Sequence, residues 1–227
     1  MPGAPGRFIC LEGPDGAGKS VTAAAIVAHL RSAGRRVTAT REPGGTHLGE
    51  LVRGVLLDTG PVERSPESDA LLFNAARGQL VREVILPALT HGEVVVCDRF
   101  APSTLAYQGY GSGLDLGRLA QLELLATGGL QPDLVLLLDV PVAVGLARRG
   151  SGDPSALTRF EDERRHDAAF HGRVRDGYLA MAAADPGRWR VIDGNRPPEV
   201  VVSDATSVVD GFLARSEPST DLARMGS

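Results

Sequence analysis

Short runs of apolar residues alternate along the chain with longer stretches in which apolar residues recur at helical spacing. The short runs predict buried strands over residues 8–12, 36–40, 94–97, 134–138 and 190–192. The longer stretches predict helices over residues 19–33, 46–57, 66–89, 102–108, 116–126, 142–149, 160–184 and 198–213. Because strands and helices alternate, we expect an α/β fold with a five-stranded parallel sheet that carries helices on both faces.

Segments rich in glycine interrupt this pattern. Residues 109–113 and 150–155 predict flexible loops, and we expect residues 150–157 to form a mobile lid. Residues 216–227 have the composition of a disordered tail, so we expect one domain over residues 1–215. No apolar run approaches the roughly 20 residues of a membrane span, and the N-terminal residues lack the apolar core of a signal peptide.

Composition narrows the possible functions. The chain of 227 residues is 43% hydrophobic and 23% charged, which is typical of a globular protein. Its net charge of −4 disfavours general binding to nucleic acid, which needs a basic surface. Its two cysteines, Cys10 and Cys97, are too few for a disulfide framework, and we expect both to stay reduced in the cytoplasm.

One lysine stands out among the 24 lysine and arginine residues. All of the others are arginines, and only Lys19 is a lysine. A lone lysine in an arginine-rich chain indicates a position that arginine cannot fill.

Lys19 belongs to a sequence that fits the phosphate-binding loop G-x-x-x-x-G-K-[ST]. A predicted strand precedes this segment and a predicted helix follows it, which is the context that the motif requires. Its backbone N–H groups and the helix N-terminus would surround phosphate oxygens. Lys19 would reach the β- and γ-phosphates, and the Ser20 hydroxyl would bind Mg²⁺. The expected ATP-binding residues here are Gly13, Pro14, Asp15, Gly16, Ala17, Gly18, Lys19 and Ser20.

A nucleotide-binding loop leaves three classes of protein open: a GTPase switch, a motor-type ATPase and a small-molecule kinase. The Asn-Lys-x-Asp motif of GTPases is absent, because Lys19 is the only lysine. The Asp-Glu strand end of motor-type ATPases is also missing, since Asp139 is followed by Val140. Another predicted strand ends in Asp98 and Arg99, a pair suited to metal or proton chemistry beside a second anion.

At these residues the chain resembles the thymidylate kinases, which transfer the γ-phosphate of ATP to dTMP. The resemblance extends from about residue 8 to residue 213. Its separate motifs lie, in order, at residues 8–20, 40–46, 72–77, 98–100, 103–104, 106–109 and 132–134. Many unrelated enzymes share the phosphate loop alone, whereas the whole ordered set is highly specific.

The resemblance implies that arginines hold the acceptor phosphate. A kinase of this kind holds two polyanions end to end, and cations must offset their repulsion. The planar fork of arginine matches a phosphate group. Arg41, Arg53 and Arg99 are the residues expected to bind the phosphate of dTMP.

The resemblance also implies roles for three acidic residues. Asp98 is expected to order Mg²⁺ through water, beside the Ser20 hydroxyl. Asp15 matches a loop carboxylate that contacts the deoxyribose 3′-hydroxyl. Glu12 either supports the metal site or is structural.

A pocket for the thymine base and the sugar also follows from the resemblance. Phe73 would stack on the base, and Arg77, one helical turn later, would hydrogen-bond it. Tyr107 matches the tyrosine that excludes a 2′-hydroxyl. The polar residues expected around the base are Ser103, Thr104 and Gln108.

The predicted lid departs from the usual family pattern. One subgroup of thymidylate kinases takes a catalytic arginine from the phosphate loop, but that position here is Gly16. The other subgroup takes it from the lid, where the candidates are Arg148, Arg149 and Arg159. Arg148 or Arg149 could instead stack on adenine. The expected catalytic set is therefore Lys19, Asp98, Arg99 and Arg159.

The resulting hypothesis is a P-loop kinase that makes dTDP from dTMP with ATP and Mg²⁺ and works as a cytoplasmic homodimer. Two alternatives remain. The chain could phosphorylate another or a modified pyrimidine nucleoside monophosphate, or it could be a nucleotide-binding regulator without catalysis.

Overall fold

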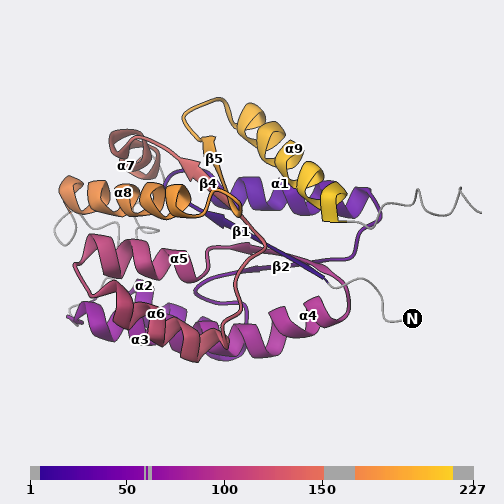
Figure 1. The fold of residues 1–227 in the computed structure, drawn as a ribbon. Coiled ribbons are helices and arrows are strands. Elements are labelled where there is room, and N and C mark those ends of the chain that lie inside the picture. The colour runs from indigo at the N-terminus through magenta and orange to yellow at the C-terminus, as the bar shows by residue number, and fades with distance from the viewer. Residues whose placement is uncertain (1–5, 59, 61–62, 151–166, 217–227) are drawn as a thin grey trace, which may run out of the picture.

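A computed structural model describes residues 6–58, 60, 63–150 and 167–216. Its core is one sheet of five parallel strands in the order β2-β3-β1-β4-β5 (Figure 1). The strands are β1 (Arg7–Glu12), β2 (Val37–Arg41), β3 (Val94–Asp98), β4 (Leu134–Asp139) and β5 (Trp189–Asp193). The predicted α/β fold with a five-stranded parallel sheet is confirmed. The predicted lid over 150–157 and the predicted tail over 216–227 are described only at their first residues, and there the prediction is wrong, because Gly150 and Ser216 are each the last residue of a helix. The other residues of both segments lie outside the described part of the chain.

Helices cover both faces of this sheet, as predicted (Figure 1). None of the described helices is long and apolar enough to cross a membrane. The helices are α1 (Lys19–Ser32), α2 (His47–Leu57), α3 (Pro66–Leu80), α4 (Leu86–Thr90), α5 (Ala101–Thr104), α6 (Leu116–Thr127), α7 (Val142–Gly150), α8 (Ala168–Ala184) and α9 (Pro198–Ser216). Two π-helical segments, η1 (Val81–Ile85) and η2 (Leu105–Gly111), continue α3 and α5.

The alternation of side chains along each strand creates two separate cores. In β1, Phe8 and Cys10 point to the core under α3, α4, η2 and α8, whereas Ile9 and Leu11 point to the core under α1 and α9. The strands β3 and β4 divide their side chains in the same way. Because both faces are buried, the central strands are apolar at nearly every position.

The predicted helix over 66–89 is one helical rod with a wider turn inside it. The turn η1 ends two residues before Pro87, and the Leu86 N–H that follows it bonds the carbonyl oxygen of Val81. Proline lacks an N–H group, and its ring crowds the carbonyl four residues earlier. We attribute the local widening to that crowding.

The glycine-rich segment 109–113 was predicted to be a flexible loop, and for residues 109–111 this prediction is wrong. The helix started by α5 continues through η2 to Gly111. A side chain at Gly111 would lie about 2.7 Å from the ring of Phe170 on α8. Both the Nε and an Nη atom of Arg173 donate to the Gly111 carbonyl oxygen, at 3.0 and 2.8 Å. The glycine therefore permits close packing between helices rather than flexibility.

The predicted helix over 160–184 is also corrected at its start. Asp167 has an extended backbone, and its side chain accepts the Phe170 N–H at 2.8 Å, which is the geometry of an N-cap. The helix α8 therefore begins at Ala168, and residues 160–166 lie outside the described part of the chain.

The sheet order brings the ends of β1 and β3 together. These strands are neighbours, with Leu11 opposite Asp98. Residues that follow neighbouring parallel strands share the carboxyl edge of the sheet, where ligands bind in folds of this type.

Candidate active site

An open cleft of about 450 Å³ lies beyond the carboxyl ends of β1 and β3. Sixteen of the residues singled out from the sequence line it, and they are Asp15, Gly16, Gly18, Lys19, Ser20, Arg41, Arg53, Phe73, Asp98, Arg99, Ser103, Thr104, Tyr107, Gln108, Arg148 and Arg149. Residues from segments far apart in the sequence thus meet in one cavity.

The phosphate loop forms one wall of the cleft, at the N-terminus of α1. Lys19 is buried, and its ammonium group donates to the carbonyl oxygens of Gly13 at 3.0 Å and Pro14 at 2.8 Å. The side chain of Lys19 thus folds back along the loop, and the residue lines the cleft. The Ser20 hydroxyl donates to an Asp98 carboxylate oxygen at 2.6 Å, which joins the loop to the end of β3.

Arg99, directly after β3, faces the loop and donates to several groups around the cleft. It forms an ion pair with Asp15 and also donates to the hydroxyl of Tyr107 at 3.3 Å. Tyr107 in turn donates to the second Asp15 oxygen at 2.7 Å. Asp15 therefore lies between a guanidinium and a phenol, and the three groups close one side of the cavity.

These charges change the acidity of the loop residues. Burial alone would raise the pKa of Asp15, but Arg99, Lys19 and the Tyr107 hydrogen bond outweigh it and hold the pKa well below its usual range. Burial and the nearby Arg99 lower the pKa of Lys19 to about 8, although Asp15 and Asp98 oppose that change. An incoming phosphate would favour the charged ammonium.

Two further arginines face the cleft, Arg41 from the end of β2 and Arg53 from α2. Arg41 pairs with Glu50, whose two carboxylate oxygens lie 3.1 and 3.2 Å from its Nη2 atom. Arg53 donates to the carbonyl oxygen of Pro43 at 2.8 Å, and burial lowers its pKa. Both guanidinium groups lie on the same cavity as Arg99.

The expected base pocket divides into residues on the cleft and one residue behind it. Phe73, Thr104 and Gln108 line the cleft, whereas Arg77 does not and is only 1% exposed. Arg77 donates to a carboxylate, a hydroxyl, an amide oxygen and a backbone carbonyl. These acceptors belong to Glu42, Thr104, Asn74 and Phe100.

Comparison with known proteins agrees with this geometry. Residues 11–205 match the thymidylate kinase family. The chain is 51% identical to a thymidylate kinase from Thermomicrobium roseum over 212 residues, which cover 93% of this chain and 98% of that protein. It is 50% identical to one from Deinococcus radiodurans over 207 residues (90% and 96%) and 47% identical to one from Geobacter sulfurreducens over 211 residues (92% and 98%).

The chain belongs to the thymidylate kinase family. The predicted family and activity are thereby confirmed, and the protein is a phosphotransferase that acts on dTMP. Thymidylate kinases use ATP together with a divalent cation.

At the donor end of this kinase, α7 packs directly on the phosphate loop. A side chain at Gly16 would overlap the carbonyl oxygen of Gly145 in α7, so an arginine could not occupy this loop position without displacing the helix. Arg148 donates to the carbonyl oxygens of Gly194 at 2.9 Å and Gly16 at 3.4 Å. Arg149 lines the cleft, and Arg159 lies outside the described residues.

Several residues that shape the site were not predicted from the sequence. Val21, Glu42, Pro43 and Leu57 also line the cleft. The expected ATP-binding residues Gly13, Pro14 and Ala17 lie behind its surface, but the first two provide the carbonyl oxygens that hold Lys19. A glycine inside a predicted helix was the available signal for Gly145, and Glu42 lies in the motif at residues 40–46, although no role was predicted for it.

Two buried glutamates share Arg77 behind the cleft. Glu42 bonds it directly, and a Glu123 carboxylate oxygen lies 3.9 Å from its Nη1 atom. Burial raises the pKa of each carboxyl to about 7, with Arg77 acting in the opposite direction. Close to neutral pH, this pair therefore holds a proton that ordinary glutamates would have lost.

This arrangement predicts how stability depends on pH. A carboxyl with a raised pKa binds more protons in the folded chain than in the unfolded chain between about pH 4.5 and 7, so its contribution to the free energy of unfolding falls as pH rises through that window. Glu123→Gln removes this contribution. We expect the variant to lose less stability than the wild type between pH 5 and 8, by on the order of 1–3 kcal/mol.

Urea unfolding at both pH values measures the effect, and replacement of the exposed Glu63 by glutamine is the matched control. An identical pH dependence in the wild type and Glu123→Gln would contradict the prediction.

Proposed function

We propose that this kinase transfers the γ-phosphate of ATP directly to the phosphate of dTMP, with Mg²⁺ as its cation. The observation that carries the proposal is the convergence of two anion-binding groups on one cleft. Lys19 and Ser20 lie on the wall formed by the loop, and Arg99 faces them from the end of β3. Ser20–Asp98 and Asp15–Arg99 contacts link the two sides.

The loop side suits the triphosphate of ATP. Gly18 caps α1 in a left-handed conformation, so the partial positive charge of the helix N-terminus faces the cleft beside the Lys19 ammonium. Arg149 also lines the cleft, which supports a position for the adenine on that side. We assign Arg159 to the transfer step from the resemblance alone.

The opposite side suits a monophosphate. Arg99, Arg41 and Arg53 bring three guanidinium groups to it, and each can bind a phosphate through two parallel hydrogen bonds. Arg99 is held by Asp15 and Arg41 by Glu50. A doubly charged phosphate would compete with these carboxylates for the same donors.

The donor atoms near Ser20 fit Mg²⁺. The Ser20 hydroxyl and the Asp98 carboxylate lie together at the phosphate loop, and this ion prefers oxygen ligands. No group of three or more candidate His, Cys, Asp or Glu ligands occurs among the described residues. That agrees with a cation held by one or two protein oxygens together with substrate phosphates and water. When bound, the ion would neutralise charge on the phosphates.

The chain's own contribution to the reaction is positioning and charge neutralisation. The acceptor is an anionic phosphate oxygen, so no strong base is required to create the nucleophile. Lys19 would stabilise the negative charge on the γ-phosphate during transfer. Arg99 would hold the acceptor phosphate in line with that group.

The acceptor preference rests on the far end of the cleft. Phe73 offers a face for a base, Gln108 and Thr104 offer polar atoms, and the Tyr107–Asp15 pair lies where the sugar would pass.

A coupled assay of ADP release over a panel of nucleoside monophosphates tests this acceptor preference. We expect the highest kcat/KM for dTMP. A higher value for another pyrimidine monophosphate would favour the first alternative, and no turnover at all would favour a silent nucleotide-binding protein.

Replacing Lys19 by arginine tests the donor side. The ammonium fits between two loop carbonyls, at 3.0 and 2.8 Å, where a broad guanidinium would displace the γ-phosphate. Because a misplacement of about 1 Å can reduce the rate roughly 100-fold, we expect Lys19→Arg to lose at least that much in kcat.

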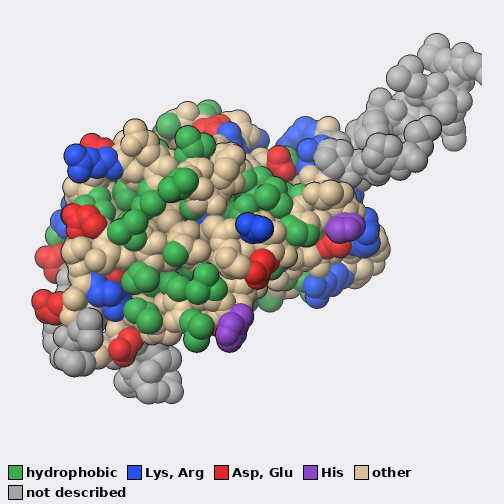
Figure 2. All heavy atoms as spheres, turned by 90° about the horizontal axis from the view of Figure 1, so that it is seen from below, with side chains coloured by type: hydrophobic (Ala, Val, Ile, Leu, Met, Phe, Trp, Pro, Cys, Tyr) green, Lys and Arg blue, Asp and Glu red, His purple; other side chains and the backbone are tan. Residues whose placement is uncertain are grey.

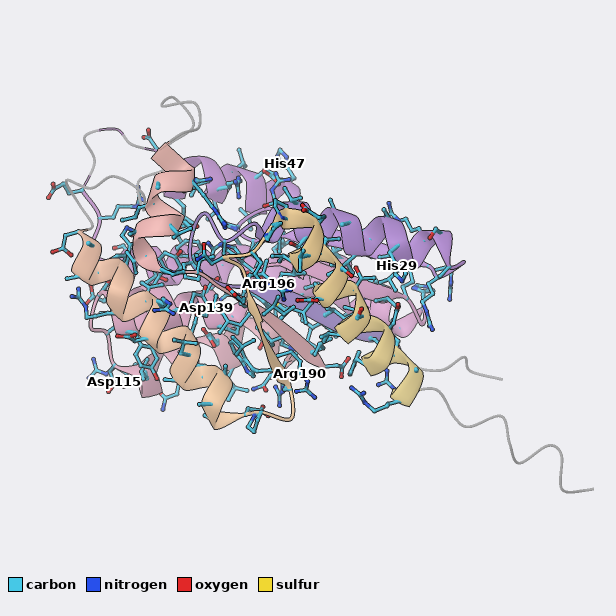
Figure 3. All side chains as sticks on the ribbon, turned by 90° about the horizontal axis from the view of Figure 1, so that it is seen from above. His29, His47, Asp115, Asp139, Arg190 and Arg196 are labelled. Atoms are coloured by element: carbon cyan, nitrogen blue, oxygen red, sulfur yellow. The ribbon has the colours of Figure 1, made fainter. Side chains whose placement is uncertain are left out.

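The melting temperature without nucleotide should change little, because Lys19 serves the ligand rather than the core. The control is Arg190→Lys, the opposite exchange at the amino end of β5, where the guanidinium donates to the carbonyl oxygens of Pro186 and Trp189 at the end of the sheet opposite the cleft (Figure 3). A Lys19→Arg enzyme with nearly wild-type kcat would contradict the assignment.

We also propose that two copies of the chain pair through an apolar face on α2, α3 and α6. The helix α3 contacts both of the others, and Figure 2 shows hydrophobic side chains gathered on this side of the molecule. Its exposed apolar residues are Leu48, Leu51, Val55, Leu71, Leu124 and Leu125. A contiguous patch of this kind is typical of a protein–protein interface.

A charge in this face should separate the two copies. Leu125 is 83% exposed, so Leu125→Glu leaves the core of the chain intact. We expect light scattering after size-exclusion chromatography to give twice the mass of one chain for the wild type and the mass of one chain for Leu125→Glu. Val191→Glu on the edge strand β5 is the control, since Val191 is 53% exposed on another part of the surface. A wild-type monomer, or an unchanged Leu125→Glu dimer, would contradict the proposal.

The remaining properties that we propose follow from the surface charge and the substrates. A net charge of −4 supports the absence of stable nucleic-acid binding. Small nucleotide substrates and two buried, unpaired thiols support a cytoplasmic location.

A further inference from the structure

Glu12, the last residue of β1, is fully buried directly behind the cleft. One carboxylate oxygen accepts the backbone N–H of Phe100 at 2.8 Å. The other accepts the hydroxyls of Ser103 at 2.7 Å and Tyr178 at 2.9 Å. The carboxylate does not line the cavity, and both of its oxygens are occupied by protein donors, so a role as a metal ligand does not fit.

The same two hydroxyls are acceptors for Arg99. Its Nη1 atom lies 3.1 Å from the oxygen of Ser103 and 3.1 Å from that of Tyr178. A guanidinium has only donors, so neither hydroxyl proton can point toward it. The two hydroxyl oxygens are also 2.9 Å apart, but whichever donates to the other, a proton remains for Glu12. The carboxylate thereby turns hydroxyl lone pairs toward the guanidinium.

The backbone conformation of Arg99 also depends on the Glu12 carboxylate. Its φ of 73° lies in the left-handed region, which a residue with a side chain seldom adopts. The Arg99 N–H donates to the Leu11 carbonyl oxygen at 2.9 Å, and the next N–H along the chain, that of Phe100, donates to Glu12. Bonds on both sides thus hold the unusual conformation.

We infer that Glu12 is a positioning residue that sets both the backbone and the side chain of Arg99, with the hydroxyls of Ser103 and Tyr178 as intermediaries. This inference rests on the proposed contact between Arg99 and the phosphate of dTMP. Tyr178 is the informative member, because it lies on α8, is buried and belongs to none of the motifs of the phosphate or base pockets.

The experiment compares a ligand that has the phosphate with one that lacks it. Calorimetry gives the Kd of dTMP and of thymidine for the wild type and for Tyr178→Phe, which removes only the hydroxyl. Because hydrogen bonds to a charged group contribute more than neutral ones, we expect dTMP to bind roughly tenfold more weakly and thymidine to bind unchanged. In the kinetic assay, the KM for dTMP should rise and the KM for ATP should not.

Tyr110→Phe is the matched control. The Tyr110 ring packs against Gly177, which lies on α8 beside Tyr178. Its hydroxyl is not among the groups that bond Arg99. A thermal melt of each variant reports folding. If Tyr178→Phe does not fold, Glu12→Gln tests the same link from the carboxylate, because it keeps the size of the side chain and removes its charge.

Arg99→Ala separates the inference from the proposed function. If Arg99→Ala abolishes the preference for dTMP over thymidine while Tyr178→Phe keeps it, Arg99 binds the phosphate but Tyr178 does not position it, and the inference is overturned. Equal weakening of both ligands by Tyr178→Phe would also overturn it, because that indicates general support of the fold. An unchanged preference in Arg99→Ala would overturn the phosphate contact itself, and the inference with it.

Discussion

The pairing of β1 with β3 is the constraint on which the rest of this site depends. Leu11 lies opposite Asp98 in the parallel register, so Glu12 and Arg99 emerge side by side, each one residue beyond that pair. The phosphate loop follows Glu12 at once, and the Arg99 segment faces it. A shift of one residue in this register would turn the side chains of one strand to the other face of the sheet and so separate Glu12 from Arg99. In the proposed mode of binding, the distance between the two phosphates is therefore set by backbone hydrogen bonds in the middle of the sheet.

A second constraint is the concentration of positive charge at that edge. Lys19, Arg41, Arg53 and Arg99 line one cavity, and their mutual repulsion must be balanced when no nucleotide is bound. Backbone carbonyls hold Lys19 and Arg53, while carboxylates hold Arg41 and Arg99. The site is thus preorganised for anions, and phosphates enter by replacing partners that are already present rather than by assembling the cations.

The sequence predicted correctly those parts of the fold and the site that depend on a local pattern of residues. Strand positions followed from apolar runs, and the phosphate loop followed from the spacing around Lys19 and Ser20. Gly111 was misread because its role depends on the Phe170 ring of α8, which approaches only in the folded chain. The start of α8 was placed too early because the helical pattern continues across Asp167, whose capping role is a local backbone choice.

The site shows the same division. Motifs gave Asp98 and Arg99 because both follow a recognisable strand, whereas the helix contact of Gly145 and the hydroxyl of Tyr178 come from tertiary packing that no spacing encodes. Arg77 illustrates the difference between position and environment. Its place on α3 was read correctly, but the buried glutamates that surround it come from two other segments of the chain.

The central claim is that one continuous cleft holds the donor and acceptor phosphates end to end. The most direct test is the binding of an adenosine–oligophosphate–thymidine conjugate, measured by calorimetry in competition with ATP and with dTMP. We expect one conjugate per chain, bound far more tightly than either nucleotide, because the second half binds as an intramolecular event. Its binding should exclude both nucleotides at once. A conjugate that displaces only one of them, or binds no more tightly than ATP alone, would contradict the account.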